Sequence, residues 1–135
     1  MGFEPSVFIN LPIRDLRSSM EFFEGLGFKF NPQFTDKNAA CLILGNTNYV
    51  MLLLEDFFRS FSEKKIIDAS ADTEMILAIS VESRAAVDSL VDKAFSLGAK
   101  PSNDSSDMGF MYSRSFQDLD NHNWEVFYMD PAHLQ

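Results

Sequence analysis

Cysteines, long apolar runs and secretion signals are scarce or missing in this sequence. The single cysteine, Cys41, excludes an internal disulfide framework and is typical of a reducing compartment. No apolar run reaches the roughly 18 to 20 residues that a transmembrane helix requires. The first residues, MGFEPSVF, lack the basic region and the apolar stretch of a signal peptide. We therefore expect a cytoplasmic protein that does not enter a membrane.

Basic residues are also few and scattered. The chain has 11 Lys and Arg against 20 Asp and Glu, which gives a formal net charge of −9. Lys64-Lys65 is the only adjacent basic pair, whereas nucleic-acid-binding proteins present clustered basic side chains to phosphates. The same scarcity disfavours an anionic membrane surface. Small molecules and further copies of the chain remain as partners, so we expect a small-molecule ligand and a homodimer.

Apolar residues are present in the amount that one domain needs, at 46% of 135 residues and with fourteen phenylalanines. Two segments, residues 6–30 and 75–101, share a design in which an alternating strand leads into a helix. The first helix is expected to begin at the N-cap Asp15 and to end at the glycines of GLG, residues 25–27. The second is expected to begin at the N-cap Ser83 and to end at Gly98. The expected apolar stripes are Leu16, Met20 and Phe23 in the first helix, and Val87, Leu90, Val91 and Ala94 in the second.

More strand-like sequence follows each helix. Residues 39–45 and 49–55 flank a turn at Gly45-Asn46, and residues 110–116 and 124–129 flank a turn around Asp118. The order is β-α-β-β-β, twice, which indicates an α+β fold built from a duplicated unit. We place module one at about 5–56, a linker at about 57–72 with a short amphipathic helix, and module two at about 73–130.

The opening NLPIRDLRSSMEFFEGLGF and the ending FMYSRSFQDLDNHNWEVFYMDP resemble the vicinal oxygen chelate superfamily, which contains glyoxalase I, extradiol dioxygenases and bleomycin-resistance proteins. The resemblance covers nearly the whole chain and is closest to a bacterial branch labelled predicted lactoylglutathione lyase. It implies two βαβββ modules that curl into a half-barrel around a small-molecule cavity, often completed by dimerisation.

The resemblance also implies four metal-ligand positions on the first and last strands of the modules. Glu125 fits one of them, but the others fall on Phe8, on Ile76 and near Leu52 or Leu53. Those side chains cannot bind a divalent ion, which needs three or four converging donors. Neither histidine, His122 nor His133, maps onto a ligand position. We therefore expect no cofactor, with a divalent metal as the alternative.

Glu125 is the candidate catalytic residue, because it lies within the apolar stretch NWEVFYM. A buried carboxylate is costly unless it is paired, hydrogen-bonded or bound to a cation. One interpretation is structural, with Arg14, Arg84 or Arg114 as its partner. The other is functional, as a general base or as the anchor of a cationic or hydrogen-bonding ligand.

Alternation along the strands predicts which side chains line the cavity, because successive residues point to opposite faces. A concave, mostly apolar pocket with few polar anchors is the usual form of a small-molecule site. Three functions remain open: a metal-free binding protein, a metal-dependent enzyme of the lactoylglutathione-lyase type, or a metal-free enzyme with Glu125 as base. The predicted pocket residues are Phe8, Asn10, Leu52, Ile76, Ala78, Ser80, Tyr112 and Phe127.

Overall fold

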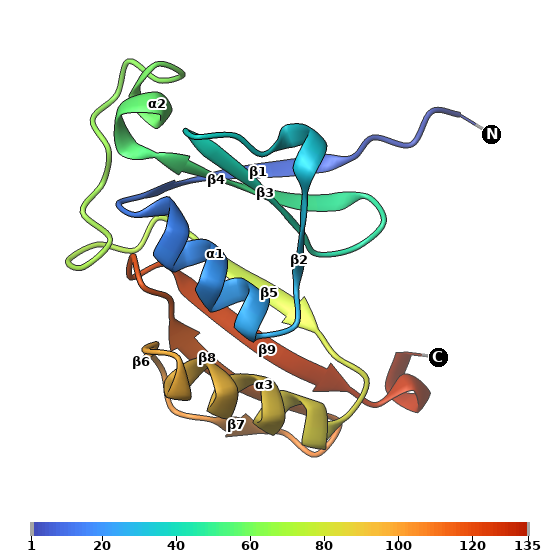
Figure 1. The fold of residues 1–135 in the computed structure, drawn as a ribbon. Coiled ribbons are helices and arrows are strands. Elements are labelled where there is room, and N and C mark those ends of the chain that lie inside the picture. Colours follow the sequence, from blue (N-terminus) through green and yellow to red (C-terminus); the bar gives the residue numbers. More distant parts are fainter. Residues whose placement is uncertain (1, 135) are drawn as a thin grey trace. The chain divides into compact units, whose positions relative to one another are not determined.

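The structure is a computed structural model that describes residues 2–134, with side chains described for residues 2–132. The chain forms two compact units, Met1–Ile67 and Asp68–Gln135. Each unit contains its own mixed sheet and one long helix (Figure 1). This composition confirms the predicted α+β class.

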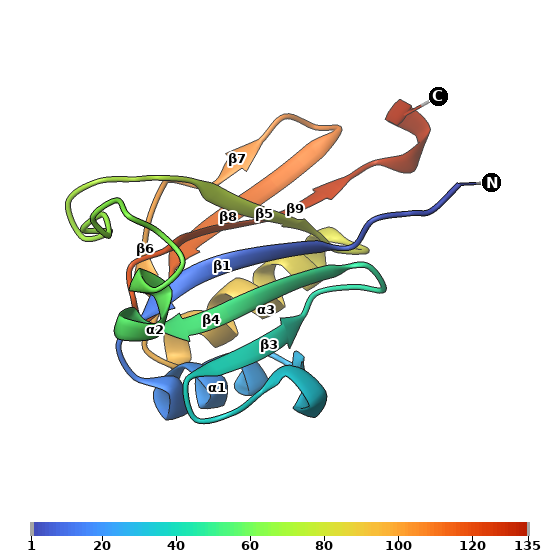
Figure 2. The same ribbon diagram turned by 90° about the horizontal axis from the view of Figure 1, so that it is seen from above.

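The N-terminal unit is a four-stranded sheet in the order β1-β4-β3-β2. Its strands are β1 (Val7–Ile13), β2 (Lys29–Asn31), β3 (Ala39–Ile43) and β4 (Asn48–Leu54). β1 runs parallel to β4, and the other pairs are antiparallel. Figure 2 shows β1, β4 and β3 side by side, with helix α1 (Leu16–Gly25) on one face. The short 3-10 helix η1 (Pro32–Phe34) links β2 to β3.

Helix α1 begins and ends where the sequence predicts. The Asp15 side chain accepts a 3.0 Å hydrogen bond from the Ser18 N–H, as an N-cap does. Gly27, just after the helix, has a φ of 100°, a conformation that side chains disfavour. The predicted stripe is only partly correct, because the helix buries Ser19, Phe22 and Phe23. The ring of Phe22 meets that of Phe23 edge to face at 5.0 Å, so the adjacent pair shares the core contact.

The C-terminal unit repeats this topology. Its sheet has the order β5-β9-β8-β6, with the two-residue strand β7 also paired to β8. The strands are β5 (Ile76–Ser80), β6 (Lys100–Pro101), β7 (Ser106–Asp107), β8 (Met111–Gln117) and β9 (Asn123–Met129). β5 is parallel to β9, as β1 is to β4. A 3-10 helix, η2 (Pro131–Leu134), follows β9.

Helix α3 (Arg84–Ser96) covers one face of this second sheet (Figure 1). The Ser83 hydroxyl accepts from the Ala86 N–H at 3.0 Å, which confirms the predicted N-cap. Val87, Val91 and Ala94 are fully buried on the predicted stripe, while Leu90 is only partly buried. Tyr112 and Arg114 of β8 reach the same helix through Asp88.

The segment between the two sheets runs from the end of β4 at Leu54 to the start of β5 at Ile76. Glu55 is not in the strand but opens helix α2 (Glu55–Arg59), two residues before the predicted helical stretch. The aromatic rings of Phe57 and Phe61 pack edge to face at 5.0 Å, and Phe61 is exposed. Among the residues that the structure describes, no helix is both long and apolar enough to cross a bilayer.

Candidate functional site on the open face of the C-terminal sheet

The sheet of the C-terminal unit has one face under α3 and one open face. Cross-strand partners share a face, so the pairs Ala78–Glu125 and Ser115–Glu125 place these three residues together. The α3 face is built from buried Leu77, Phe116, Trp124 and Val126. The open face of the three strands carries Ile76, Ala78 and Ser80 of β5, Asn123, Glu125, Phe127 and Met129 of β9, and Met111, Ser113, Ser115 and Gln117 of β8.

Glu125 lies at the centre of this open face. Its strand, β9, is flanked by β5 on one side and β8 on the other. The side chain is partly buried, and it makes no hydrogen bond or ion pair with the residues that the structure describes. A partly dehydrated carboxylate without a protein partner is free to accept hydrogen bonds from a ligand.

The predicted structural role of Glu125 is wrong for two of its three suggested partners. Arg84 forms a two-point pair with Asp107, at 2.9 Å for each contact. Arg114 bridges Asp88 and Asp92, again at 2.9 Å each. Both arginines lie with α3, on the opposite face of the sheet from Glu125. Arg14 belongs to the N-terminal unit and has other interactions.

The deeply buried carboxylate of this region is Asp118 and not Glu125. Asp118 is 4% exposed and accepts from the Trp124 indole N–H at 2.9 Å and from the backbone N–H groups of Asp120 and His122 at 2.9 and 3.0 Å. Burial raises the pKa of the Asp118 carboxyl, while His122 and these N–H donors oppose the rise. Asn121 has a φ of 66°, so the turn needs a residue that tolerates the left-handed region. His122 belongs to this turn, because its N–H donates to the Asp118 side chain and its carbonyl accepts from the Asp118 N–H.

Two polar neighbours of Glu125 are already engaged. The Ser115 hydroxyl accepts from the Asn103 N–H at 2.8 Å, and the Asn123 side chain contacts Ser102 at 3.0 Å and Thr73 at 3.1 Å. Both residues were missed as site residues at the level of sequence. Period-two spacing from Glu125 would have found Asn123, but Ser115 depends on the β8–β9 register.

The predicted pocket residues of the C-terminal unit are mostly found together. Ile76, Ala78 and Ser80 are exposed on the face that carries Glu125, and partly buried Phe127 lies on the same face. The prediction that Tyr112 lines the pocket is wrong. Its hydroxyl donates to Asp88 of α3 at 2.7 Å, so its side chain faces away from Glu125. This prediction failed because β8 has polar residues on both of its faces, so the sequence does not show which face of the strand carries the pocket.

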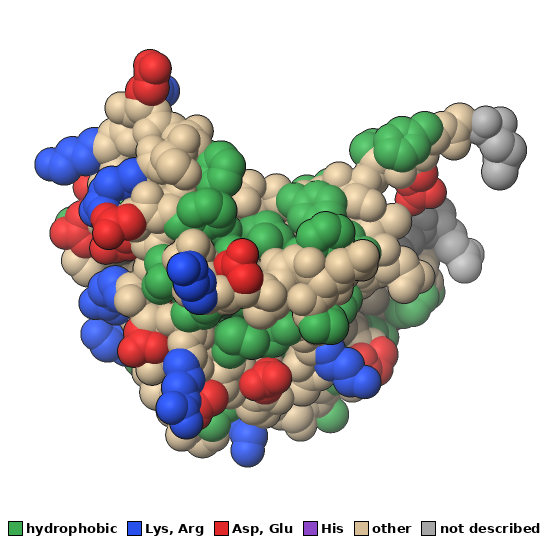
Figure 3. All heavy atoms as spheres, turned by 45° about the horizontal axis from the view of Figure 1, so that its top comes forward, with side chains coloured by type: hydrophobic (Ala, Val, Ile, Leu, Met, Phe, Trp, Pro, Cys, Tyr) green, Lys and Arg blue, Asp and Glu red, His purple; other side chains and the backbone are tan. Residues whose placement is uncertain are grey.

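The predicted residues of the N-terminal unit also divide between two faces. Phe8 is 46% exposed and stacks on its cross-strand partner Tyr49, with ring centroids 4.8 Å apart. Asn10 is exposed on the same face. The prediction that Leu52 lines the pocket is wrong, because Leu52 pairs with Leu11 on the other face of the sheet and is fully buried in the core. Figure 3 shows that hydrophobic side chains reach the protein surface in groups between charged ones.

A family-type metal centre does not fit the donor set of this chain. Phe8, Ile76 and Leu52 offer no oxygen, nitrogen or sulfur ligand at the positions that the resemblance implies. Among the described residues, no group of three or more His, Cys, Asp or Glu side chains could hold a metal ion. The His133 side chain lies outside the described residues. Glu125 alone is too few ligands for a structural or catalytic zinc site.

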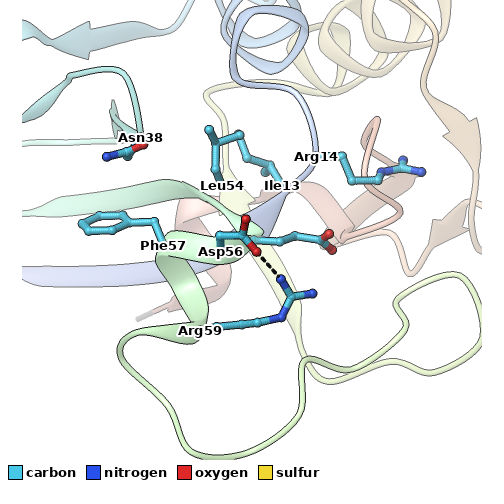
Figure 4. A pocket seen from close by; sticks show the side chains of 8 residues that line it. Ile13, Arg14, Asn38, Leu54, Asp56, Phe57 and Arg59 are labelled. Atoms are coloured by element: carbon cyan, nitrogen blue, oxygen red, sulfur yellow. Dashed lines mark hydrogen bonds and ion pairs between the residues drawn. The ribbon is translucent and has the colours of Figure 1, made fainter.

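The N-terminal unit has a separate pocket of about 340 Å³ (Figure 4). It lies where β1 and β4 end and α2 begins, and an Arg59–Asp56 ion pair of 2.7 Å lies at its edge. Both side chains of the pair are more than half exposed, so the pair is weak. None of the predicted site residues lines it. Its lining is Ile13, Arg14, Asn38, Leu54, Glu55, Asp56, Phe57 and Arg59.

Comparison with known proteins gives a family match for the first part of the chain. Residues 6–45, which contain β1, α1, β2 and β3, match the family described as bleomycin resistance protein-like N-terminal. A comparison with curated proteins found no significant match.

Solved structures resemble the chain over almost its full length. A hypothetical protein from S. aureus is 29% identical, with a TM-score of 0.79 over 94% of this chain and 95% of its own. A glyoxalase/bleomycin resistance protein/dioxygenase family enzyme from Burkholderia phytofirmans is 18% identical, with a TM-score of 0.74 over 90% and 96%. The fosfomycin resistance protein FosX from Mesorhizobium loti is 16% identical, with a TM-score of 0.68 over 98% of both chains.

The family match and the shared fold confirm the resemblance that the sequence predicts. At these identities the structures inform on fold, and they leave the ligand and the reaction open. The chain therefore has the fold of these glyoxalase/bleomycin resistance proteins over nearly its full length, and its residues 6–45 match the bleomycin resistance protein-like N-terminal family.

Proposed function

We propose that the protein binds a small molecule on the open face of its C-terminal sheet, with the Glu125 carboxylate as the polar anchor and without the family metal. The observation that carries this proposal is the position of Glu125: central in the sheet, partly buried, and without a partner among the described residues. A carboxylate kept in that state is stabilised by any ligand that brings a positive charge or a strong donor.

The neighbours of Glu125 suit the rest of such a ligand. Exposed Ile76 and partly buried Phe127 and Met129 provide apolar surface, and methionine adapts to irregular shapes. Among the described residues, no Lys or Arg belongs to the open face of β5, β8 and β9. A ligand with an apolar body and a protonated amine would match this surface. A protein with a net charge of −9 also attracts cations over a distance.

The names of two similar proteins refer to resistance against small molecules. The matched family is called bleomycin resistance protein-like, and FosX is called a fosfomycin resistance protein. Binding of a toxic small molecule needs a pocket and no catalytic group, so it is compatible with the missing metal ligands at Phe8 and Ile76. Bleomycin is therefore a natural first compound for a binding screen, and fosfomycin, an anionic phosphonate, should bind weakly beside Glu125.

The anchoring role of Glu125 can be tested with two molecules of nearly equal size. Benzylamine and benzyl alcohol would be titrated into ¹⁵N-labelled protein, with the amides of Ala78 and Glu125 followed by NMR. We expect benzylamine to bind more tightly, and Glu125→Gln to weaken it by roughly tenfold or more, because a charge-assisted hydrogen bond is lost. Binding of benzyl alcohol should change little.

The matched control is Glu82→Gln, which removes the same charge at an exposed position outside the sheet. If the Glu82 variant weakened benzylamine as much as the Glu125 variant, the effect would come from net charge alone. Equal binding of the amine and the alcohol to the unmodified protein would contradict the proposal. Metal content after reloading with Zn²⁺, Ni²⁺, Mn²⁺ or Fe²⁺ tests the metal-free part, and we expect far less than one ion per chain.

A second candidate is a metal-free enzyme in which Glu125 is a general base. The same unpartnered carboxylate favours it, since a base must be able to reach a substrate proton. Turnover that Glu125→Gln abolishes while binding persists would select this candidate. A metal-dependent reaction of the lactoylglutathione-lyase type would require stoichiometric metal.

We also propose a cytoplasmic homodimer, in line with the resemblance. Exposed large side chains such as Phe3, Phe34 and Phe61 supply apolar surface of the kind that interfaces cover. Light scattering coupled to size-exclusion chromatography should give twice the 15.3 kDa chain mass. A mass of one chain at all concentrations would contradict the dimer.

A further inference from the structure

The connection between β6 and β7 leaves the outer edge of β8 and then returns to it. Pro101 of β6 pairs with Phe116, and Ser106 of β7 pairs with Ser113. Residues 102–105, between these two short strands, make no ladder pairs with β8. We call these four residues the bulge loop. Its sequence is SNDS, and Asn103, Asp104 and Ser105 are exposed.

One anchor holds the bulge loop on the face that carries Glu125. The Ser115 hydroxyl accepts from the Asn103 N–H at 2.8 Å and donates to the Asn103 carbonyl at 3.2 Å. Ser115 is the direct cross-strand partner of Glu125, and such partners lie on one face about 5 Å apart. The backbone of Asn103 is therefore held at Ser115, one strand away from Glu125 and on the same side of the sheet.

A second anchor holds the preceding residue. The Ser102 hydroxyl lies 3.0 Å from Oδ1 of Asn123, and the Asn123 side-chain N–H donates to the Thr73 hydroxyl at 3.1 Å. Asn123 is two residues before Glu125 on β9, so both side chains share the open face. Both anchors thus act on the side of the sheet where Glu125 lies.

Hydrogen bonds also hold the end of the connection at β7. The Arg84 guanidinium donates to both carboxylate oxygens of Asp107 and to the Gly109 carbonyl, at 2.8 to 2.9 Å. The Arg84 carbon Cζ also lies 5.2 Å from the centre of the Tyr112 ring. The bulge loop is therefore held at both ends, and its position on the open face is restricted.

Ser115 and Asn123 are polar neighbours of Glu125, yet Ser115 bonds to the bulge loop and Asn123 bonds to the loop and to Thr73. Glu125 is left without a partner among the described residues, and the bulge loop is fixed at Ser115, on the β8 side of Glu125. We propose that the bulge loop, positioned by Ser115 and Asn123, determines the size of ligand that the Glu125 site accepts. This inference rests on the proposed function, and Ser115 and Asn123 are positioning residues in it.

The test compares Ser115→Ala with the unmodified protein. Two amines serve as probes, benzylamine and the longer 4-phenylbenzylamine, and their affinities are measured by NMR titration. Loss of the Ser115 hydroxyl should free the bulge loop. The affinity for 4-phenylbenzylamine relative to that for benzylamine should then rise by roughly threefold or more, the effect of one net hydrogen bond. Hydrogen exchange at the Asn103 amide should accelerate in the same variant, because its acceptor is gone.

Ser102→Ala removes the other anchor and should shift the ratio in the same direction. Ser96→Ala is the matched control, since the Ser96 hydroxyl bonds only to the Lys93 carbonyl within α3 at 2.6 Å. An unchanged ratio in Ser115→Ala, with faster exchange at Asn103, would overturn the role of the loop while leaving Glu125 as the anchor. Unchanged exchange would overturn the anchoring itself. Failure of both amines to bind the unmodified protein would overturn the proposed function, and this inference with it.

Discussion

The indole N–H of Trp124 donates a 2.9 Å hydrogen bond to Oδ2 of Asp118 inside the C-terminal unit. Trp124 is 1% exposed and Asp118 is 4% exposed, so water does not replace this bond. The turn that contains Asp118 is therefore hydrogen-bonded to buried Trp124 of β9, the strand that also carries Glu125. Any weakening of the bond should loosen the entry into β9.

Replacement of Trp124 by Phe should destabilise the protein by about 2 to 4 kcal/mol, because the core loses volume and Asp118 loses a donor. Urea unfolding followed by circular dichroism would measure the change. A double-mutant cycle with Asp118→Ala, which removes the acceptor, separates the two causes, since only the hydrogen bond requires both side chains. Strictly additive effects would show that the Trp124–Asp118 bond contributes nothing to stability.

Asp118 should also make stability depend on pH. Burial raises the pKa of its carboxyl above 3.8, so the folded chain binds a proton at a pH where the unfolded chain has lost it. The contribution of Asp118 to stability is then full below the ordinary pKa and falls as pH rises through the raised value. We expect the stability of the unmodified protein relative to Asp118→Asn to decrease as pH rises from 3.8 through the raised pKa of Asp118. An increase over that range would mean that the folded carboxyl has a lowered pKa.

Asp107 should show the opposite behaviour. The hydrogen bonds from Arg84 lower the pKa of its carboxyl to about 2, with help from the Gly109 N–H. The stabilising contribution of the pair is present above the ordinary value of 3.8 and is lost as pH falls through about 2. Carboxyl ¹³C NMR should report a midpoint at about 2. In Arg84→Gln the midpoint should rise toward 3.8, while that of Asp88, which pairs with Arg114, should stay in place.

Cys41 should be protected from thiol reagents in the folded protein. Its side chain is fully buried in β3, and burial raises the pKa of the thiol. Reaction with a disulfide reagent near pH 8 should be slow in buffer and fast in urea. Ser96→Cys on a Cys41→Ala background provides an exposed thiol for comparison. Equal native rates for the two thiols would contradict the burial of Cys41.

Much of the fold could be predicted from local chemistry. Asp15 and Ser83 mark the helix starts because each side chain caps the backbone N–H of a residue three positions later. Gly27 and Gly98 mark the ends because both adopt a positive φ. Phe8 and Ile76, which alternation in β1 and β5 assigned to the cavity face, are both exposed in the structure.

The candidate site was only partly predictable. Glu125 could be recognised because a carboxylate stands out in an apolar strand, yet its lack of a partner depends on where Arg84 and Arg114 fold. Tyr112 was placed on the wrong face because β8 mixes polar and aromatic residues on both faces. Leu52 was placed in the pocket because β4 is apolar at nearly every position, so sequence could not define its inner face.

The sequence by itself determined the class of protein: an acidic α+β chain with two βαβββ units, helix caps at Asp15 and Ser83, and one conspicuous carboxylate at Glu125. These features depend on residues that are near in the chain, where spacing alone decides the geometry. Only the tertiary structure decided that Asp118 is the buried acid, that Arg114 pairs with Asp88 of α3, and that Ser115 holds the bulge loop on the side of the sheet that carries Glu125. Those outcomes depend on strand register and on competition among distant partners, which local sequence does not specify.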